Sequence, residues 1–535
     1  MSRRSRTAVL VTVLSALFCR AAGDDRSALI ARGKLLYLQN CVICHQGSGQ
    51  GAPGTFPPLA KSDYLMAKAE NGIRAVVEGL SGRITVNGTN YNNTMPPVLL
   101  TDEQVAAVLT FVRANWNGAG DFISATQVKE VREKSRFKTY NALKAAASYA
   151  PLPKAPTGFS IREVVRFTEN PVRMALKGGK ELYVLSEAGN LWRVDGVGRI
   201  QQVLRAEQYL EPKRGGANPL GFTFDRTGRL FVTANRRLTE ARPCVTNEVT
   251  IYRSLNADAP LGLEPYLRVT YPWGIGPFNH GVSHIAQGPD GFLYVTSGSR
   301  TDGNETGTDS RYFQGGELDT TACIWRVSTE GVTHPEIYAR GLRNSFGFCW
   351  DDRGEMFATE NGPDADRPEE LNVIEHGKHY GFPFQFGDST NKPYAYTPDA
   401  PSEVQFTLPV VNLGPNGGFD GGPISTFDPH SSPAGIIFCD DTFPPSLRGT
   451  FLVTRFGNLL KRDKDVGFDL LQMRVRKTAA GYEAETKTWL APLARPIDVI
   501  ALNGSIYVLE YSRPLNNKGD VPMLPGRLLE LHPQK

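Results

Sequence analysis

The sequence has little net charge and no long apolar run beyond its N-terminal segment. Its 59 Lys and Arg residues nearly balance 55 Asp and Glu residues, which leaves a formal net charge of +4. So small an excess gives no argument for a nucleic-acid partner, which would require a basic surface. A transmembrane helix needs about 20 predominantly apolar residues, and the sequence offers no such stretch. We therefore expect neither nucleic-acid binding nor an integral membrane span.

Length and composition bound the fold class. At 535 residues the chain is too long for one compact core, so two or more domains are expected. The 54 Gly and 37 Pro residues favour many short strands joined by turns over an all-helical protein.

Cysteine is also scarce, yet two of the seven cysteines belong to the most specific motif in the chain. Cys41 and Cys44 are separated by two residues and followed at once by His45. This spacing is typical of c-type haem, because each thiol bonds one vinyl group of the porphyrin and the imidazole ligates the iron. A zinc site would need further ligands, but residues 46–118 contain no Cys and no His. A redox dithiol would need a βαβ context, which is not visible, so the motif predicts covalent haem c.

The first residues have the character of an export signal. A basic segment with three arginines precedes an apolar run over 9–18, and small residues follow at 21–23. The run is short for a membrane span, and Phe18 argues against a lipid-modified Cys19 because a small residue should precede such a cysteine. We expect a cleaved signal peptide over 1–23 and a periplasmic or secreted protein. Export agrees with haem c, which is attached outside the bacterial cytoplasm.

Four cysteines remain after the signal and the haem motif. They are Cys244, Cys323, Cys349 and Cys439. An oxidising compartment permits disulfides among them, but their pairing cannot be deduced from sequence. Buried free thiols are an equal alternative.

Residues 24–120 are predicted to form a small helical domain. Helices are expected over 27–39, 63–70 and 71–80, and a last helix begins at Thr101, which forms a capping-box pattern with Gln104. The haem iron needs a sixth ligand if it only transfers electrons, and this domain offers Met66 and Met95. Met66 has helical spacing typical of a core residue. Met95 lies in a loop stiffened by two prolines, so we expect it to be the distal ligand, and His/Met ligation raises the reduction potential.

The order of these features resembles class I cytochrome c domains. The haem motif ends the first helix, Phe56-Pro57-Pro58-Leu59 follows it, and Met95-Pro96-Pro97 precedes the last helix. The resemblance covers nearly the whole small domain.

A polar, helix-prone connector, over 121–156, leads to a large domain over 157–535. Six units recur there, each with an apolar strand, a turn carrying Asp and Gly, and one or two further strands. Six such units indicate an all-β six-bladed propeller, in which Ile161 to Phe167 supplies the outer strand that joins the last blade to the first. A β-sandwich is the alternative, which the number of similar units disfavours.

Several segments of the large domain closely resemble the soluble quinoprotein glucose dehydrogenase and sorbosone dehydrogenase family. They are Gly341-Leu342-Arg343-Asn344, Glu360-Asn361-Gly362-Pro363-Asp364, Glu370-Leu371-Asn372, Gly377-Lys378-His379-Tyr380-Gly381-Phe382-Pro383 and the stretch from His280 to Gly291. The family uses pyrroloquinoline quinone (PQQ) with Ca²⁺ in a six-bladed propeller.

The resemblance implies a set of cofactor residues. Arg343 would pair with an oxygen group of PQQ, and Asn344 would hydrogen-bond the cofactor. Arg495 aligns with a cofactor arginine, but the family's second arginine is Ile497 here. Arg455 is a further basic candidate.

The same resemblance assigns the metal and the base. The carbonyl oxygens of Gly362 and Pro363 would bind Ca²⁺, which prefers hard oxygen ligands. His280 would be the general base that takes the proton of the substrate hydroxyl. His284 is a secondary candidate.

We therefore expect a PQQ-dependent dehydrogenase of a sugar or related alcohol or aldehyde. Its electrons would pass to its own haem c and then to an external acceptor, a cytochrome or a quinone-linked chain. One alternative is a propeller without PQQ that acts as a binding or docking module beside an electron-transfer cytochrome. A weaker one is a calcium propeller that hydrolyses a lactone, which leaves the haem without a role.

Overall fold

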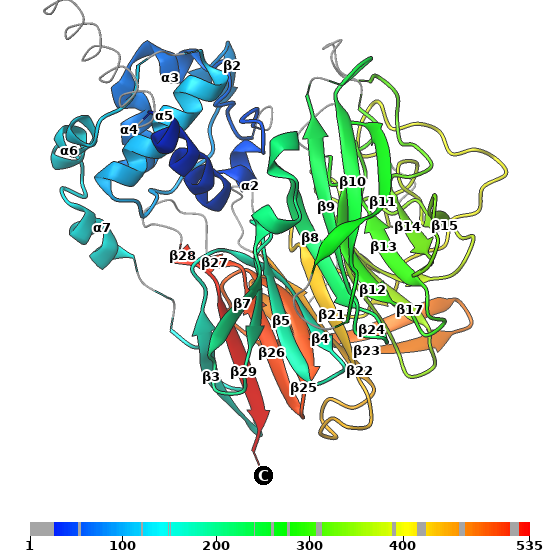
Figure 1. Cartoon of the computed structure of the whole chain (residues 1–535). Coiled ribbons are helices and arrows are strands. Elements are labelled where there is room, and N and C mark those ends of the chain that lie inside the picture. Colours follow the sequence, from blue (N-terminus) through cyan, green and yellow to red (C-terminus); the bar gives the residue numbers. More distant parts are fainter. Residues whose placement is uncertain are drawn as a thin grey trace, which may run out of the picture. The chain divides into compact units, whose positions relative to one another are not determined.

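The chain folds into two compact units, with the boundary after Ala147. The computed structural model (Figure 1) describes residues 26–51, 55–118, 121–147, 149, 151–239, 241–257, 262–274, 279–305, 313–387, 392–414, 424–458, 466–513 and 524–534. The expected signal peptide over 1–23 lies outside these residues. Within them, no helix has both the length and the apolar character that crossing a membrane requires.

The first unit is helical. A helix over 26–40 is followed by α2 (Val42–His45), α3 (Asp63–Ala67), α4 (Ala69–Glu78), the hairpin β1 (Ile84–Val86) and β2 (Thr89–Tyr91), α5 (Asp102–Trp116), α6 (Ala125–Glu133) and α7 (Tyr140–Ala146). The capping box predicted for Thr101 and Gln104 is confirmed, since each side chain bonds the backbone of the other. A Cβ atom on Gly33 would lie 2.1 Å from Ala107 O, so glycine allows the first helix to approach α5 closely.

The connector contributes to the core of this unit. Val128 of α6 is buried in the same cluster as the inner residues of α5. Arg132 is also buried, and it pairs with Asp102 at 2.6 Å and donates to Leu100 O at 2.8 Å. Helix α6 therefore packs as part of the helical unit.

The second unit is the predicted six-bladed propeller. The blades are β4 (Pro171–Lys177), β5 (Glu181–Ser186), β6 (Leu191–Val194) and β7 (Ile200–Leu204); β8 (Asn218–Phe224), β9 (Leu230–Leu238), β10 (Thr246–Ser254) and β11 (Leu263–Pro272); β12 (Val282–Gln287), β13 (Leu293–Ser297), β14 (Cys323–Val327) and β15 (Glu336–Arg340); β16 (Ser345–Trp350), β17 (Met356–Glu360) and β18 (Glu370–Ile374); β21 (Pro433–Cys439), β22 (Thr450–Arg455), β23 (Asp469–Thr478) and β24 (Gly481–Leu490), extended by β19 (Val411–Asn412) and β20 (Ile424–Ser425); and β25 (Pro496–Leu502), β26 (Ser505–Glu510), β29 (Arg527–Pro533) and β3 (Phe159–Arg166). A small pair, β27 (Ser512–Arg513) and β28 (Leu524–Pro525), and two 3₁₀ turns, η1 (Ala206–Gln208) and η2 (Pro212–Arg214), lie outside the blades.

Ring closure follows the prediction. Strand β3 pairs antiparallel with β29, so the beginning of the propeller completes its last blade. The first strands of the blades contact one another in the order β4, β8, β12, β16, β21 and β25, and β25 contacts β4 again. The inner strands come so close that a Cβ atom on Gly347 would lie 2.1 Å from Ala434 O of the next blade.

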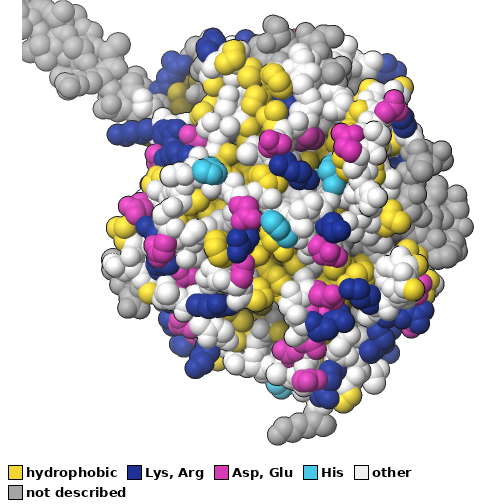
Figure 2. Space-filling model, turned by 90° about the vertical axis from the view of Figure 1, so that its right-hand side faces the viewer, with side chains coloured by type: hydrophobic (Ala, Val, Ile, Leu, Met, Phe, Trp, Pro, Cys, Tyr) yellow, Lys and Arg dark blue, Asp and Glu magenta, His cyan; other side chains and the backbone are white. Residues whose placement is uncertain are grey.

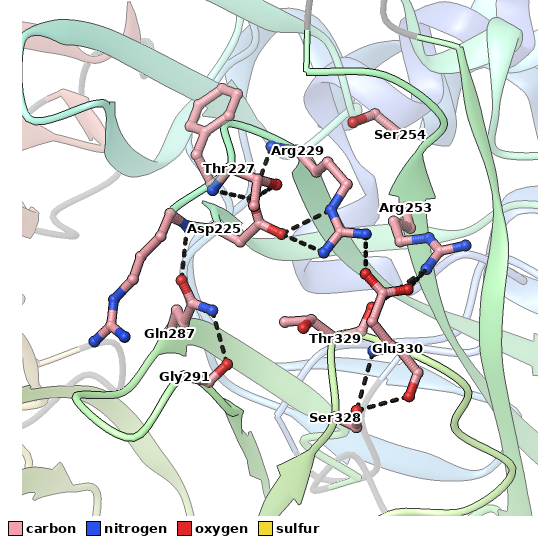
Figure 3. A network of polar contacts seen from close by, with 12 residues as sticks. Asp225, Thr227, Arg229, Arg253, Ser254, Gln287, Gly291, Ser328, Thr329 and Glu330 are labelled. Atoms are coloured by element: carbon pink, nitrogen blue, oxygen red, sulfur yellow. Dashed lines mark hydrogen bonds and ion pairs between the residues drawn. The ribbon is translucent and has the colours of Figure 1, made fainter.

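An aspartate organises the turn between the first two strands of several blades. Figure 3 shows Asp225 in the second blade, whose Oδ1 accepts hydrogen bonds from the backbone N–H groups of Thr227 and Arg229, both at 2.9 Å. Asp351 makes the same pair of bonds in the fourth blade, at 3.0 and 2.8 Å. A short carboxylate side chain can close such a turn by itself, which explains the recurring Asp in the sequence. Glu330 links the blades by contacting Arg229 and Arg253 (Figure 3).

Charged side chains of both signs are mixed on the face that Figure 2 shows. On the face in Figure 2, Lys and Arg side chains lie among Asp and Glu side chains over most of the area. This agrees with the small net charge of the sequence.

The topology gives every blade a common end. In each blade the first strand begins, and the second strand ends, at the mouth of the ring opposite the Asp turns. Residues just before a first strand or just after a second strand therefore gather at one mouth.

Candidate functional site

The haem motif lies where the first helix meets α2. Cys41 precedes α2 and Cys44 lies within it, so one helical turn separates the two thiols. His45 is buried, and its Nδ1 lies 2.9 Å from Pro57 O. Because a carbonyl oxygen only accepts, Nδ1 is the protonated nitrogen, which leaves Nε2 available to the iron. Burial lowers the pKa of His45 and so favours the neutral imidazole that ligates a metal.

Backbone hydrogen bonds hold Met95 in place. Its N–H donates to Leu80 O at 2.9 Å, and Leu80 N–H donates to Met95 O at 2.8 Å. Gly79 has a φ of 77°, and a Cβ atom there would lie 2.5 Å from Met95 O. Glycine at 79 therefore permits this close approach. Met66 lies on α3, half-buried.

Met95→Ala is expected to lower the haem reduction potential by on the order of 0.1 V or more, within the roughly 0.8 V that axial ligands span. The thioether stabilises the reduced iron, and alanine offers no replacement. A redox titration with the visible spectrum measures the shift. Met66→Ala is the control and should leave the reduction potential and the visible spectrum unchanged. The opposite pattern would make Met66 the ligand.

The residues assigned to PQQ and Ca²⁺ all lie at the common mouth. His280 precedes β12, Arg343 and Asn344 precede β16, Gly362 and Pro363 follow β17, Arg455 ends β22, and Arg495 precedes β25. His280 and Asn344 are immediate neighbours: a Cβ atom on Gly298 would lie 2.5 Å from His280 Cβ and 3.3 Å from Asn344 Oδ1.

The hydrogen bonds around His280 define its tautomer. Ser299 Oγ has one hydrogen, which it donates to Thr301 O at 2.6 Å. It therefore accepts from His280 Nδ1, 3.3 Å away, so Nε2 is left with a free lone pair. Burial, reinforced by the charge of Arg343, lowers the pKa of His280 to about 3. The imidazole is thus a neutral base at physiological pH.

Arg343 is held by a buried carboxylate that sequence reasoning missed. Its Nη2 pairs with Asp302 Oδ1 at 2.5 Å, its Nε donates to Asp302 O at 3.1 Å, and its Nη1 donates to Asn361 O at 3.0 Å. Tyr394 donates its hydroxyl hydrogen to Asp302 Oδ2. Burial opposes ionisation, yet the Arg343 guanidinium keeps the pKa of Asp302 below its ordinary value. The only sequence signal for Asp302 was its place after a second strand, and Tyr394 had none.

The loop proposed for calcium contains an unused oxygen. Asn361 Oδ1 is buried and has no hydrogen-bond partner among the described residues. Gly362 packs closely below it, since a Cβ atom there would lie 3.1 Å from Pro368 O. Within the described residues, no group of three His, Cys, Asp or Glu side chains is arranged to hold a metal ion.

Two buried carboxylates anchor the loops on either side. Glu360 accepts from Arg343 N–H at 2.6 Å, and Asn372 Nδ2 bridges Glu360 and Glu370 at 3.0 Å each. Burial and the neighbouring Glu370 raise the pKa of Glu360 well above its ordinary value. The pair fixes the Arg343 loop against the end of β17.

Arg455 and Arg495 have different surroundings. Arg455 is buried and pairs with Asp469 at 2.7 Å and with Asp428 at 3.1 Å, so two carboxylates offset its charge. Arg495 donates to the carbonyl oxygens of residues 457 and 458, and its guanidinium lies 5.0 and 5.2 Å from the centres of the Phe456 and Phe468 rings. The described contacts of Arg495 are thus with carbonyl oxygens and aromatic rings, whereas those of Arg455 are with carboxylates. Ile497, where the family has its second arginine, is buried in the core.

His284, the secondary candidate for the base, lies within β12 and not before it. His284 is half-buried inside the ring, and Phe348 N–H donates to its Nδ1 at 3.3 Å. The four cysteines left open by the sequence are free thiols. Burial raises the pKa of Cys439 to about 12, which makes that thiol unreactive.

Glu187 is a buried acid at the same mouth, just after β5. Its carboxyl group accepts from Tyr511 Oη at 2.5 Å and from Asn170 Nδ2 at 3.2 Å, and the side chain of Glu169 lies nearby. Burial raises the pKa of Glu187 to about 8, against the effect of both hydrogen bonds. The folded protein therefore holds a proton there that the unfolded chain loses above its ordinary carboxyl pKa.

This proton predicts a pH dependence of stability. The contribution of a raised carboxyl pKa is complete below the unfolded value and is lost as pH rises through about 8. Glu187→Gln should therefore show a smaller fall of the propeller's Tm between about pH 6 and 9 than the parent protein. Glu181→Gln, an exposed residue of β5, is the control in calorimetry. Equal slopes in all three proteins would refute a protonated Glu187.

Comparison with known proteins agrees with both units. A model of the cytochrome c family matches residues 30–116, and one described as glucose/sorbosone dehydrogenase matches residues 168–509. The chain is 39% identical over 114 residues to cytochrome c-552 of Thermus thermophilus, across 19% of this chain and 86% of that protein. It is 31% identical over 103 residues to the cytochrome c subunit of a quinone alcohol dehydrogenase of Gluconobacter oxydans, across 19% of this chain and 22% of that protein.

Among solved structures, the PQQ-bound aldose sugar dehydrogenase of Streptomyces coelicolor is 21% identical, with a TM-score of 0.46, over 71% of this chain and 99% of that one. The glucose/sorbosone dehydrogenase match alone covers more than half of the chain, and His280, Arg343 and Asn344 lie within it. The chain therefore belongs to the glucose/sorbosone dehydrogenase family and has a cytochrome c domain ahead of its propeller.

Proposed function

We propose that this protein is an exported, PQQ-dependent dehydrogenase of a sugar or related alcohol or aldehyde that passes electrons to its own haem c. The observation that carries the proposal is the meeting of a neutral histidine, His280, with Arg343 and Asn344 at one mouth of a family propeller whose chain also has a haem motif.

The residues at the mouth fit PQQ and Ca²⁺. Arg343 uses three of its five N–H donors on Asp302 and Asn361. Two donors remain for an oxygen group of the cofactor, and Arg495 and Asn344 add a cation and an amide. Asn361 Oδ1, which has no hydrogen-bond partner among the described residues, supports a cation site at this loop, where Gly362 and Pro363 would supply carbonyl oxygens to Ca²⁺.

PQQ supplies a quinone that accepts a hydride, and haem supplies a one-electron carrier. His280 performs the proton chemistry: its Nε2 takes the proton of the substrate hydroxyl, while the Nδ1–H bond to Ser299 keeps the ring oriented. The low pKa of His280 keeps the base neutral before the step.

Electron balance gives the cytochrome domain its role. Oxidation of one CH–OH group releases two electrons and two protons, but the chain has one haem motif. One haem would therefore supply a carrier for these electrons one at a time, and an external acceptor would have to reoxidise it between the two transfers. The cytochrome c subunit of a quinone alcohol dehydrogenase from Gluconobacter oxydans is a precedent for a cytochrome c that belongs to a dehydrogenase.

Ile497 favours a second candidate, a propeller that has lost PQQ and acts as a docking module. One experiment separates the two. The haem-loaded protein is titrated with PQQ and Ca²⁺, then mixed with a panel of aldoses and polyols while the reduced haem band is recorded. Saturable PQQ binding followed by haem reduction is the expected result, and no PQQ binding would refute the dehydrogenase.

A further inference from the structure

Arg173 lies inside the ring, on the innermost strand of the first blade. It is on β4, and its side chain is completely buried. The sequence segment around it contains none of the motifs of the cofactor site. Its partners, however, lie 110 and 173 residues away along the chain.

The guanidinium of Arg173 contacts the inner strands of three other blades. Its Nη2 donates to Ser283 O of β12 at 3.3 Å and to Phe346 O of β16 at 2.9 Å. Its Nη1 lies 3.5 Å from Asp498 Oδ1 of β25, and the guanidinium lies 4.8 Å from the centre of the Phe346 ring. Asp498 Oδ2 in turn accepts Met174 N–H of β4 at 2.7 Å.

These three strands are the ones that directly follow His280, Asn344 and Arg495 at the common mouth. Ser283 is three residues after His280, Phe346 is two after Asn344, and Asp498 is three after Arg495. A strand rises about 3.3 Å per residue. Each residue that Arg173 contacts therefore lies two or three residues further along its strand than the mouth residue that it supports. One buried side chain thus connects the base, the cofactor amide and the cofactor arginine.

The local charges leave Arg173 little freedom. Asp498 is its counter-charge, and His284, the other titratable group facing it, is neutral because burial and then Arg173 lower the pKa of His284 well below its ordinary value. Nε and Nη1 of Arg173 have no hydrogen-bond partner among the described residues. Burying these two donors without hydrogen bonds is unfavourable. The protein nevertheless keeps an arginine here, where its guanidinium contacts three strands.

We propose that Arg173 is a positioning residue that sets the relative placement of His280, Asn344 and Arg495 through the ends of β12, β16 and β25. The role is unassigned by the family motifs and rests on the proposed function for its catalytic consequence. Displacements near 1 Å at an active site can cost about 10²-fold in rate. A change at Arg173 should therefore weaken PQQ binding and catalysis without touching the cofactor.

The test compares Arg173→Met with Arg236→Met in the full, haem-loaded chain. Arg236 is a matched control on the second strand β9: it is as deeply buried, and it pairs with Glu248 at 2.9 Å. Its hydrogen bonds and ion pairs among the described residues are with Leu210, Glu211 and Glu248, and not with β12, β16 or β25. Arg173→Met should raise the PQQ dissociation constant at least tenfold and lower kcat. Arg236→Met should lose comparable thermal stability and keep the dissociation constant within twofold. Equal affinities in both variants, or equal losses, would overturn the proposal.

Two further measurements keep the result decisive. Arg173→Lys, which keeps the charge, should recover part of the affinity, whereas a purely volumetric role predicts no recovery. If Arg173→Met does not fold, Asp498→Asn removes the counter-charge while its amide oxygen still accepts Met174 N–H, and should weaken PQQ binding in the same direction.

Hydrogen exchange separates this proposal from the proposed function. Without any cofactor, Arg173→Met should accelerate amide exchange together at residues 281–285, 345–348 and 496–499, and Arg236→Met should not. If the parent protein binds no PQQ, the dehydrogenase proposal fails, while the exchange pattern still decides whether Arg173 holds the three strands. Unchanged exchange at these segments would refute its positioning role.

Discussion

Replacing His280 with Ala is expected to slow substrate-dependent haem reduction by about 10²- to 10⁴-fold, the range that a positioned general base contributes. The alanine variant loses an imidazole whose Nε2 carries the lone pair that accepts a proton, since Nδ1 is bonded to Ser299. PQQ affinity should change little because the charged contacts of Arg343 remain. The rate is measured by stopped-flow absorbance of the haem band after mixing with substrate.

The control for His280→Ala is His334→Ala, an exposed histidine beside Thr333 that lies away from the inner strands. It should behave like the parent protein. A small added base such as imidazole should restore part of the rate of His280→Ala if the lost function is proton transfer. A rate within threefold of the parent would remove His280 from the mechanism.

The second large effect is expected from the double variant Cys41→Ala, Cys44→Ala. Without either thioether bond the haem is lost on denaturation, and substrate-dependent reduction of an external cytochrome should fall to background. The propeller does not depend on these cysteines for its fold, so oxidation of substrate with an artificial two-electron dye should persist. A haem stain after denaturing electrophoresis measures covalent haem, and a dye-linked assay measures substrate oxidation.

The single variants provide the control for this experiment. Cys41→Ala and Cys44→Ala each keep one thioether, so each should retain covalent haem and a part of the cytochrome-linked rate. Loss of dye-linked activity in the double variant would contradict the proposal that the propeller oxidises the substrate and the cytochrome c domain only transfers electrons.

Features set by local sequence were predictable. The haem motif, the capping box at Thr101 and the Asp turns each depend on residues within five positions of one another. Six repeats of one hairpin pattern led to the propeller, and the outer strand β3 followed from the need to close the ring.

Features made by distant residues were not. Asp302 meets Arg343 across 41 residues and Tyr394 across 92, and Arg173 meets Phe346 across 173. No periodicity marks such pairs, because they depend on how the blades are arranged around the axis. The hairpin of β1 and β2 and the packing of α6 were missed for a related reason: each consists of short or polar segments whose stability comes from tertiary contacts.

Two of the arginines that the sequence predicted to bind the cofactor have different surroundings in the structure. Arg455 looked like a cofactor cation by residue type, yet Asp428 and Asp469 offset its charge. Arg495 instead donates to backbone carbonyls and lies 5.0 and 5.2 Å from the centres of two aromatic rings. Charge alone in a sequence does not distinguish these two arginines; their neighbours do.

The central claim is that the electrons reaching the haem come from the propeller of the same chain. The most direct measurement is the rate of haem reduction in a single turnover of the PQQ-loaded protein with excess sugar, repeated over a wide range of protein concentrations. We expect a first-order rate constant that does not depend on protein concentration. A rate that rises in proportion to protein concentration would mean that electrons travel between molecules, and the account would be contradicted.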